Sequence, residues 1–213
     1  AAGYRATNFT VGDLSNWDTS SATSMYETFS LAGWYSETWD VGLLSNWDVS
    51  NVTTMYRMFY QIGYDKVNSI TLNLSAWRPK SVTTFADMFK EAGYNATGVS
   101  IGDLSNWDVS SATTMTYMFH RFGYNGVAPF NIGNLATKTV ELEDGTTYTA
   151  WDMTGVTDIS YMFGATARKS DDFYIGDLGN WNVSDVTNMA GLFNFPGESD
   201  LDWYVGDLSN WDV

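Results

Sequence analysis

Tryptophan residues at a fixed spacing are the feature that most limits how this chain can fold. Seven of its ten tryptophans follow one another at intervals of 30, 30, 30, 44, 30 and 30 residues, most of them in the phrase Leu-Ser-Asn-Trp-Asp. They are Trp17, Trp47, Trp77, Trp107, Trp151, Trp181 and Trp211. A period of this length is typical of tandem-repeat proteins, in which each unit packs on its neighbours. We therefore expect a single domain, residues 1–213, of about six to seven repeats.

Each repeat continues from its tryptophan with further residues at constant offsets. A threonine stands six residues after it, a phenylalanine twelve residues after it, and methionines mostly eight and eleven residues after it. We expect these phenylalanines to be buried in a single continuous row: Phe29, Phe59, Phe89, Phe119, Phe163 and Phe193. Apolar positions three and four residues apart predict a short amphipathic helix, capped by the threonine at its N-terminus. Glycines after it, at Gly33, Gly63, Gly93 and Gly123, predict its left-handed end.

A short extended segment precedes most of the tryptophans. Val11–Leu14 and Ile101–Leu104 share one apolar pattern, and Ile70–Leu74 alternates apolar and polar residues. This alternation predicts one β-strand per repeat, and strands repeated at a fixed interval predict a parallel sheet. The sequence therefore predicts an α/β repeat solenoid with one short parallel strand and one short helix per 30-residue coil.

The 44-residue interval departs from the repeat. Its additional residues include the stretch from Thr139 to Tyr148, which alternates around Asp144-Gly145. An Asp-Gly pair between alternating segments is a strong turn signal. We expect a β-hairpin inserted at about 136–150, projecting from one edge of the solenoid.

The two ends of the sequence fall inside repeats. Gly3-Tyr4 occupies the position that Gly93-Tyr94 holds in a later repeat, and Val213 follows the last repeat tryptophan by two residues. Terminal repeats of a solenoid need polar caps, and none is visible here. We expect a fragment of a longer array, or self-association end to end.

The stretch from Leu44 to Phe59, Leu-Ser-Asn-Trp-Asp-Val-Ser-Asn-Val-Thr-Thr-Met-Tyr-Arg-Met-Phe, resembles the BspA-like repeat of bacterial surface proteins. The resemblance covers nearly the whole chain except the insertion. It implies a leucine-rich-repeat-like fold and a non-enzymatic protein displayed at the cell surface. It also implies adhesion to host or matrix proteins, or to other cells. The period of 30 residues is longer than the roughly 25 residues usual for that family.

Charge and composition exclude several kinds of partner. Ten Lys and Arg against 25 Asp and Glu give a formal net charge of -15, which repels nucleic acid and anionic lipid. No apolar run approaches the length of a membrane span, so we expect no membrane insertion of this segment. There is no cysteine, and disulfides and thiolate chemistry are excluded. The 44% hydrophobic content indicates a folded chain.

The residue types that act in catalysis in other proteins form no catalytic pattern in this sequence, and we therefore predict no enzyme. The one histidine, His120, has no nucleophile elbow or second base, and we interpret it as a solvated surface residue. Aspartate pairs such as Asp13 with Asp18 and Asp103 with Asp108 recur with the repeat, whereas a catalytic pair occurs once. We predict no catalytic residues, no cofactor and no metal site. Calcium held by carboxylates between coils is left open, because carboxylates are dense but no calcium-binding motif is present.

Two groups of residues could contact partners. Aromatic residues directly after the glycines form a candidate contact strip, either exposed or acting as a lid on the core: Trp34, Tyr64, Tyr94 and Tyr124. Five Asn-X-Ser/Thr sequons give candidate glycosylation sites at Asn8, Asn51, Asn73, Asn95 and Asn182.

Two functions from different classes fit these features. The first is a non-enzymatic extracellular protein, structural or adhesive, of a cell surface or an extracellular filament. The alternative is a carbohydrate- or peptide-binding module that uses the sheet face or the aromatic strip. Glycans and cell-surface proteins are the expected outside partners.

Overall fold

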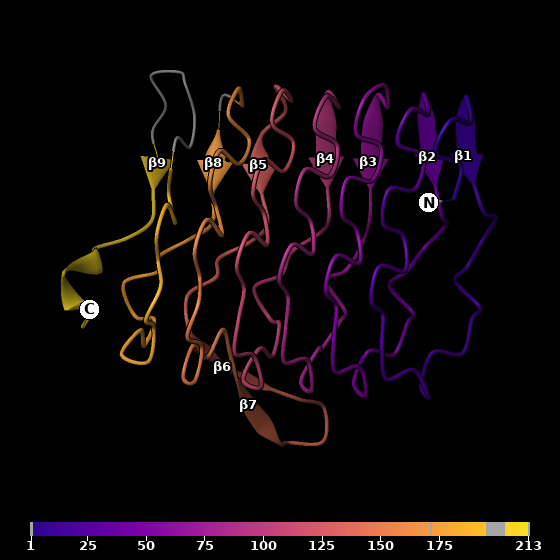
Figure 1. Ribbon diagram of the computed structural model, residues 1–213. Coiled ribbons are helices and arrows are strands. Elements are labelled where there is room, and N and C mark those ends of the chain that lie inside the picture. Colours follow the sequence, from indigo (N-terminus) through magenta and orange to yellow (C-terminus); the bar gives the residue numbers. More distant parts are fainter. Residues whose placement is uncertain (1, 171, 195–202, 213) are drawn as a thin grey trace.

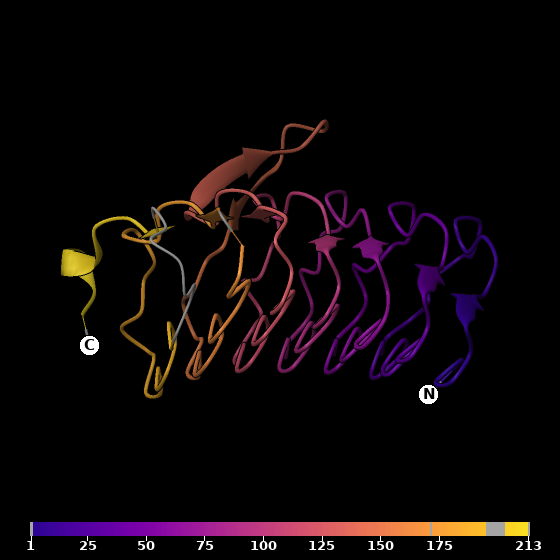
Figure 2. The same cartoon turned by 90° about the horizontal axis from the view of Figure 1, so that it is seen from above.

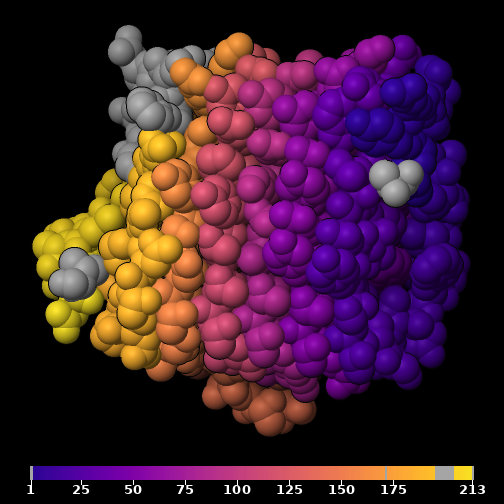
Figure 3. All heavy atoms as spheres, in the orientation of Figure 1, coloured from indigo at the N-terminus to yellow at the C-terminus, as the bar shows by residue number. Residues whose placement is uncertain are grey.

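The computed structural model describes residues 2–170, 172–194 and 203–212. Successive repeats lie side by side as coils, from β1 at one end of the row to β9 at the other (Figures 1 and 2). In the space-filling view the coils form bands that follow the order of the sequence (Figure 3). Each coil therefore packs chiefly against the coil before it and the coil after it.

Short parallel strands lie on one side of the coils. The pairs are β1 (Asn8–Thr10) with β2 (Thr38–Asp40), β3 (Ser69–Thr71) with β4 (Gly98–Ser100), β5 (Phe130–Asn131) with β8 (Phe173–Tyr174), and β8 with β9 (Trp203–Tyr204). The strands thus form small separate sheets. In β1, β2 and β3 the central residue is buried and its two neighbours are exposed.

The strands lie slightly earlier in the sequence than predicted. β1 ends at Thr10, before the predicted segment begins at Val11, and β4 ends at Ser100, before Ile101. The glycine of each of these two predicted segments has a left-handed backbone, with φ of 81° at Gly12 and 88° at Gly102. Such a residue ends an extended strand, because φ is negative throughout a β-strand.

The prediction of a helix in every coil is wrong, and with it the α/β solenoid of leucine-rich-repeat type. The helical element among the described residues is one 3₁₀ helix, Leu208–Asn210. Where a helix was predicted in the second coil, alternate amides from Met55 to Gln61 donate to carbonyls of the next coil at 2.9–3.1 Å. Between them, the amides of Met58 and Tyr60 close turns to the residue three positions earlier, and the Tyr56 amide donates to the Thr54 hydroxyl at 3.3 Å. An α-helix would direct all these amides to carbonyls four residues back, so bonds between coils replace it.

We call this part of each coil, residues 25–33 and its equivalents, the turn segment. Its backbone includes left-handed residues other than glycine, such as Arg57 at φ 54° and Gln61 at φ 52°. This conformation costs roughly 1–2 kcal/mol per residue, and the bonds to both neighbouring coils offset it. Met55, Met58, Phe59 and Ile62 are all buried. The segment thus buries the predicted stripe through successive turns rather than through a helix.

Rows of identical side chains run through the core along the stack. Phe29, Phe59, Phe89, Phe119 and Phe163 are buried, and Phe193 is partly buried. Neighbouring rings in this row lie 5.4–6.0 Å apart and nearly parallel. The predicted phenylalanine row is therefore confirmed. Stacked, offset rings add about 0.5–1.5 kcal/mol per pair beyond the burial of their area.

The repeat tryptophans join each coil to the one before it. From the second coil onward the indole Nε1 donates to the carbonyl of the leucine that precedes the previous tryptophan, for example from Trp77 to Leu44 at 2.8 Å. The bond recurs at 2.7–3.0 Å for Trp47, Trp107, Trp151, Trp181 and Trp211. Each indole thus buries its polar atom with a partner, which explains why the spacing of this residue is fixed.

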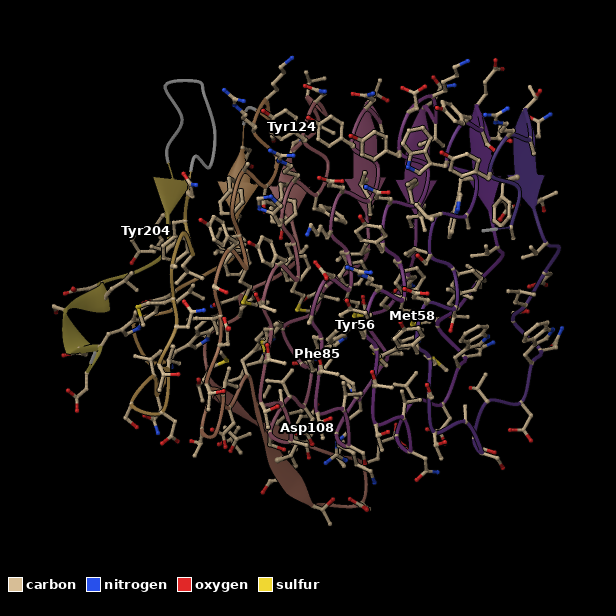
Figure 4. All side chains as sticks on the ribbon, in the orientation of Figure 1. Tyr56, Met58, Phe85, Asp108, Tyr124 and Tyr204 are labelled. Carbon is tan, nitrogen blue, oxygen red and sulfur yellow. The ribbon has the colours of Figure 1, made fainter. Side chains whose placement is uncertain are left out.

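The long interval holds an antiparallel hairpin, β6 (Lys138–Glu141) and β7 (Thr147–Ala150), which projects beyond the coils (Figure 2). Its base is attached to the stack. The Tyr148 hydroxyl donates to the Asn106 carbonyl at 2.5 Å, and the Arg78 guanidinium lies 4.1 Å from the centre of its ring. Arg78 also pairs with the buried carboxylate of Asp108, labelled near the hairpin in Figure 4.

In the part of the chain that the structure describes, there is no helix with the length and apolar character needed to cross a membrane.

Candidate functional site: the aromatic strip and the hollow at its end

The four predicted strip residues come together in one stack on the outside of the coils. Trp34, Tyr64, Tyr94 and Tyr124 are partly buried, and consecutive ring centroids lie 4.6, 4.7 and 4.6 Å apart at angles of 13° or less. Tyr4 extends the stack at its beginning, 5.4 Å from Trp34. We call these five residues the strip. It follows the turn segments, and its last ring, Tyr124, lies beside β5 in Figure 4.

The strip presents ring edges to solvent rather than ring faces. Because each internal ring is covered on both faces by its neighbours, Trp34, Tyr64 and Tyr94 retain no face on which a sugar ring could stack. Burial raises the pKa of Tyr64 and of Tyr94, with the Glu91 carboxylate as the next contribution at Tyr64. Their hydroxyls therefore stay protonated at neutral pH and can donate hydrogen bonds. The strip acts mainly as a lid that joins four coil boundaries, one of the two roles that the sequence left open.

Charged side chains of the turn segments border the strip. Arg57 pairs with Asp87 at 3.3 Å, and Asp87 with Lys90 at 3.0 Å. A second chain of contacts runs from the Trp34 indole to Gln61, from Gln61 to Glu91 at 2.5 Å, and from Arg121 to Glu91 at 3.3 Å. Asp87 and Glu91 are buried. These pairs link successive coils and hold two acidic groups that would be costly to bury alone.

The strip ends in a hollow of about 320 Å³. Its lining residues are His120, Arg121, Tyr124, Ala165, Arg168 and Asn194. Arg168 takes the place of the next aromatic ring: its guanidinium carbon lies 5.3 Å from the centre of the Tyr124 ring, and it donates to the Tyr124 hydroxyl. Two guanidinium groups thus flank one tyrosine, in a protein whose net charge is strongly negative.

His120 is partly buried in the wall of this hollow, so its interpretation as a solvated surface residue is wrong. Its ring meets Tyr117 and Tyr161 edge to face, at 5.1 and 5.8 Å. Burial above all, and then the charges of Arg121 and Lys90, lower the pKa of His120 to about 4. His120 is therefore neutral at physiological pH. Its position in the sequence gave no sign of this, because Tyr161 and lining residues such as Ala165 come from the next coil.

The aspartates of the repeat phrase organise local turns. Asp13 accepts from the Ser15 amide at 2.9 Å, and Asp18 accepts from the amide and hydroxyl of Ser20. Hydrogen bonds from Ser15 lower the pKa of Asp13, and those from Ser20 lower the pKa of Asp18. Within residues 2–170, 172–194 and 203–212, no three Asp, Glu or His side chains lie close enough together to hold a metal ion. The calcium hypothesis thus has no ligand cluster in this part of the chain.

All five sequon asparagines are exposed, but their amides differ in what they bond. The side-chain nitrogens of Asn51, Asn95 and Asn182 donate to neighbouring coils, the first to the Ser20 carbonyl at 2.8 Å. Asn8 and Asn73 use their side-chain oxygens as acceptors, and their nitrogens donate to no other described residue. A glycan on Asn51, Asn95 or Asn182 would replace a bond between coils, whereas one on Asn8 or Asn73 would not.

Comparison with known proteins gives one family. The model described as "Mycoplasma protein of unknown function, DUF285" matches residues 2–125, 63–144 and 131–213. The three overlapping matches cover nearly the whole chain and reflect its tandem repeats. Neither the curated proteins nor the solved structures contain a match to this chain.

Proposed function

Because the chain belongs to the DUF285 family of tandem-repeat proteins, whose function is unknown, we propose that it is a non-enzymatic structural or adhesive protein of a cell surface or an extracellular filament. The observation that carries the proposal is the repetition of the same three sets of contacts from coil to coil. The tryptophan bonds, the phenylalanine row and the strip all use equivalent residues in successive coils. A scaffold needs such uniform cohesion, whereas an enzyme needs one group of residues that occurs once.

The chemistry of the outer surface also supports a scaffold. Acidic side chains beside the strip are held in pairs that link coils, as with Asp87 and Glu91. The resemblance of the Leu44–Phe59 phrase to BspA-like repeats supports display at a cell surface and adhesion to other cells or to host and matrix proteins. Unmatched negative charge keeps such a displayed protein soluble.

Surface labelling tests this proposal. In cells that produce the protein, antibodies raised against residues 1–213 should bind intact cells, and external protease should remove the labelling. An antibody against an internal protein of the same cells is the control and should bind only after permeabilisation. Labelling by both antibodies only after permeabilisation would exclude a surface role.

A second candidate function is a binding module for peptides or carbohydrates that carry carboxylate groups. It is favoured by the hollow, where the Arg121 guanidinium lies 5.9 Å from the centre of the Tyr124 ring. Guanidinium groups bind carboxylates with two parallel hydrogen bonds, and an aromatic wall orients the ligand. The covered ring faces of the strip disfavour a module that binds neutral sugars by stacking along it.

An array of neutral and acidic glycans, together with acidic peptides, separates the two functions. A binding module should retain acidic probes at low salt and lose them in the Arg121→Gln variant, while Lys138→Gln on the exposed hairpin serves as the charge-matched control. Equal retention by both variants, or none by the wild type, would reject this alternative and leave the scaffold proposal standing.

A further inference from the structure

The outer side of the parallel strands carries a row of exposed residues that includes two tyrosines. The last residue of each of these strands is exposed, and we call the row the sheet face: Thr10, Asp40, Thr71, Ser100, Asn131, Tyr174 and Tyr204. The first five are small and polar, whereas Tyr174 and Tyr204 are large and aromatic. This change of residue type in two neighbouring coils is a local feature, which the uniform packing of the repeat does not require.

The backbone holds the two tyrosines side by side. Tyr174 and Tyr204 are Cα partners in the parallel pair of β8 and β9, and Asn131 of β5 is the partner of Tyr174 on its other side. The residues before Asn131 and Tyr174 are Phe130 and Phe173, which are buried and stack at 5.0 Å. Since successive side chains of a strand point to opposite faces, these buried rings keep Asn131 and Tyr174 on the outer side.

Both tyrosine rings of the sheet face are exposed. Tyr174 is 39% exposed although a strand lies on each side of it, and Tyr204 is 60% exposed. Within the described ranges neither ring stacks on another ring, and neither hydroxyl forms a hydrogen bond. The internal rings of the strip differ, because they cover one another on both faces. The sheet face therefore offers aromatic surface of a kind that the strip lacks.

Hydrogen-bonding groups next to the tyrosines are unused as well. The Asn131 side-chain oxygen accepts from the Gly133 amide at 2.9 Å, but its nitrogen donates to no other described residue. The hydroxyls of Thr71 and Ser100 have no hydrogen-bond partner in the described part of the chain. Neighbouring strands lie roughly 4.8 Å apart, so these groups recur at a short and regular interval along the sheet face.

The sheet face has no cationic side chain. No lysine or arginine occurs in β1–β5, β8 or β9, and Asp40 is the one carboxylate of the row. Such a face cannot neutralise phosphate, sulfate or carboxylate groups, and the net charge of -15 repels them. Its chemistry suits a neutral ligand with both C–H groups and hydroxyls. A sugar ring has both, because its C–H groups pack on the negative face of an aromatic ring while its hydroxyls bond to amides and hydroxyls.

We infer that the sheet face binds a neutral polysaccharide, with sugar rings packed on Tyr174 and Tyr204 and the sugar chain continuing past Asn131 and Ser100. Figure 4 labels Tyr204 beside β9, where this site ends. A polysaccharide repeats one hydroxylated ring after another, so it matches a row of polar groups at a fixed interval better than the irregular surface of a protein does. The inference deepens the proposed adhesive role, on which it rests, by naming the class of partner.

Affinity electrophoresis of the purified chain tests this inference. Native gels that contain mannan, galactan or soluble glucan provide the probes, and a gel without polysaccharide gives the intrinsic mobility of each protein. At least one of the three polysaccharides should retard the wild type. The variants Tyr174→Ser and Tyr204→Ser restore the small polar residue of the other coils, and each should weaken the binding by at least about tenfold.

The matched control is Tyr26→Ser. Tyr26 is 54% exposed but lies in the turn segment and not on the sheet face, so this variant should be retarded as the wild type is. Arg121→Gln, in the hollow, should also be retarded as the wild type is. Circular dichroism of the three tyrosine variants should show the wild-type spectrum, since all three positions are exposed. Retardation should be the same at about 10 mM and about 150 mM NaCl, because a neutral sugar has no charge to screen.

Three results would overturn the inference. They are no retardation by any of the three polysaccharides, equal retardation of the sheet-face variants and of Tyr26→Ser, and retardation that is lost at the higher salt concentration. The first result would leave Tyr174 and Tyr204 as candidates for a protein interface, where tyrosine is enriched. None of them changes the surface labelling of intact cells, so the failure of polysaccharide binding is distinguishable from the failure of the proposed function.

Discussion

Phe89 shows how a single side chain connects three coils. Its ring is fully buried, and its centroid lies 5.4 Å from those of Phe59 and Phe119. Its amide donates to Met118 in the next coil, so side chain and backbone join the same neighbours. A residue in such a row contributes to two boundaries at once, unlike one at the exposed end of a row.

Replacing Phe89 by Ala should lower the free energy of unfolding by about 3–5 kcal/mol, because the cavity would lie between two rings that cannot move together. Urea unfolding followed by tryptophan fluorescence measures this loss. Tyr26→Ala is the control: Tyr26 is 54% exposed and stacks on one ring only, and its loss should stay below about 1 kcal/mol. Similar losses at both positions would contradict the assignment of interior and exterior.

His120 makes stability depend on pH. Its pKa is lowered to about 4 in the folded protein, chiefly by burial, from 6.5. Between these values the unfolded chain binds a proton that the folded chain does not, so the contribution is complete above pH 6.5 and is lost as pH falls toward 4. Because His120 keeps partial contact with solvent, we expect a loss of about 1 kcal/mol between about pH 7.5 and about pH 5.

The His120→Gln variant isolates this effect, since glutamine does not titrate and the carboxylates remain the same in both proteins. Urea midpoints measured at the two pH values should fall further for the wild type than for the variant. A parallel decrease in both proteins would show that His120 does not titrate between its folded and unfolded values.

At the scale of elements, the turn segment is the feature that distinguishes this fold from the one predicted. Replacing a residue by glycine has opposite effects on stability at a left-handed position and in the interior of a helix. Ala165 has φ of 53°, and glycine there removes a steric cost of roughly 1–2 kcal/mol. Glycine in a helix interior instead destabilises by roughly 0.5–1 kcal/mol relative to alanine.

Ala165→Gly should therefore stabilise the protein by about 0.5–1 kcal/mol after the entropy of the unfolded chain is included. Ala190→Gly is the control, because Ala190 is exposed and is not among the residues with positive φ; it should destabilise by a similar amount. Thermal unfolding of both variants gives the signs. Destabilisation by Ala165→Gly would favour a helical turn segment.

The repeat, its buried phenylalanine row and the members of the strip could be predicted from the sequence, because each depends on spacing alone. The helix could not be excluded in this way. Met55, Met58, Phe59 and Ile62 have the spacing of a helical stripe, and successive turns bury the same residues. What decides between them is the bonding of alternate amides to another coil, which one repeat does not reveal. A glycine at position 191, equivalent to Arg57, was a local sign that this position of the turn segment is left-handed.

The candidate site was predicted in its residues but not in its geometry. Spacing placed Trp34, Tyr64, Tyr94 and Tyr124 in one row, yet only the 4.6–4.7 Å stacking shows that ring faces are covered. The hollow was missed because it lies where large side chains are missing. Gly164 and Ala165 occupy the positions at which an earlier coil has Lys90 and Glu91. Small residues at positions that are large in other repeats are the signal that could have located it.

At the scale of the whole molecule, repulsion among the excess negative charges opposes the packing of coil on coil, which the rows of stacked side chains stabilise. The formal net charge is -15, and in the ion pairs between coils the arginine side chains stay partly exposed although their partners Asp87 and Glu91 are buried. Exposed pairs contribute about 0–1 kcal/mol each, whereas repulsion acts among all the unmatched carboxylates. Screening by salt should therefore weaken the repulsion among the carboxylates more than it weakens the attraction within the ion pairs.

The unfolding temperature at about pH 7 should rise by a few degrees between about 10 mM and about 150 mM NaCl, where the screening length falls from about 30 Å to about 8 Å. Differential scanning calorimetry measures the change. The dependence should weaken as pH approaches the pI near 4.1, because the net charge vanishes there, whereas a general salting-out effect would persist. An unfolding temperature that falls with salt at pH 7 would mean that the ion pairs beside the strip, rather than the packed rows, hold the coils together.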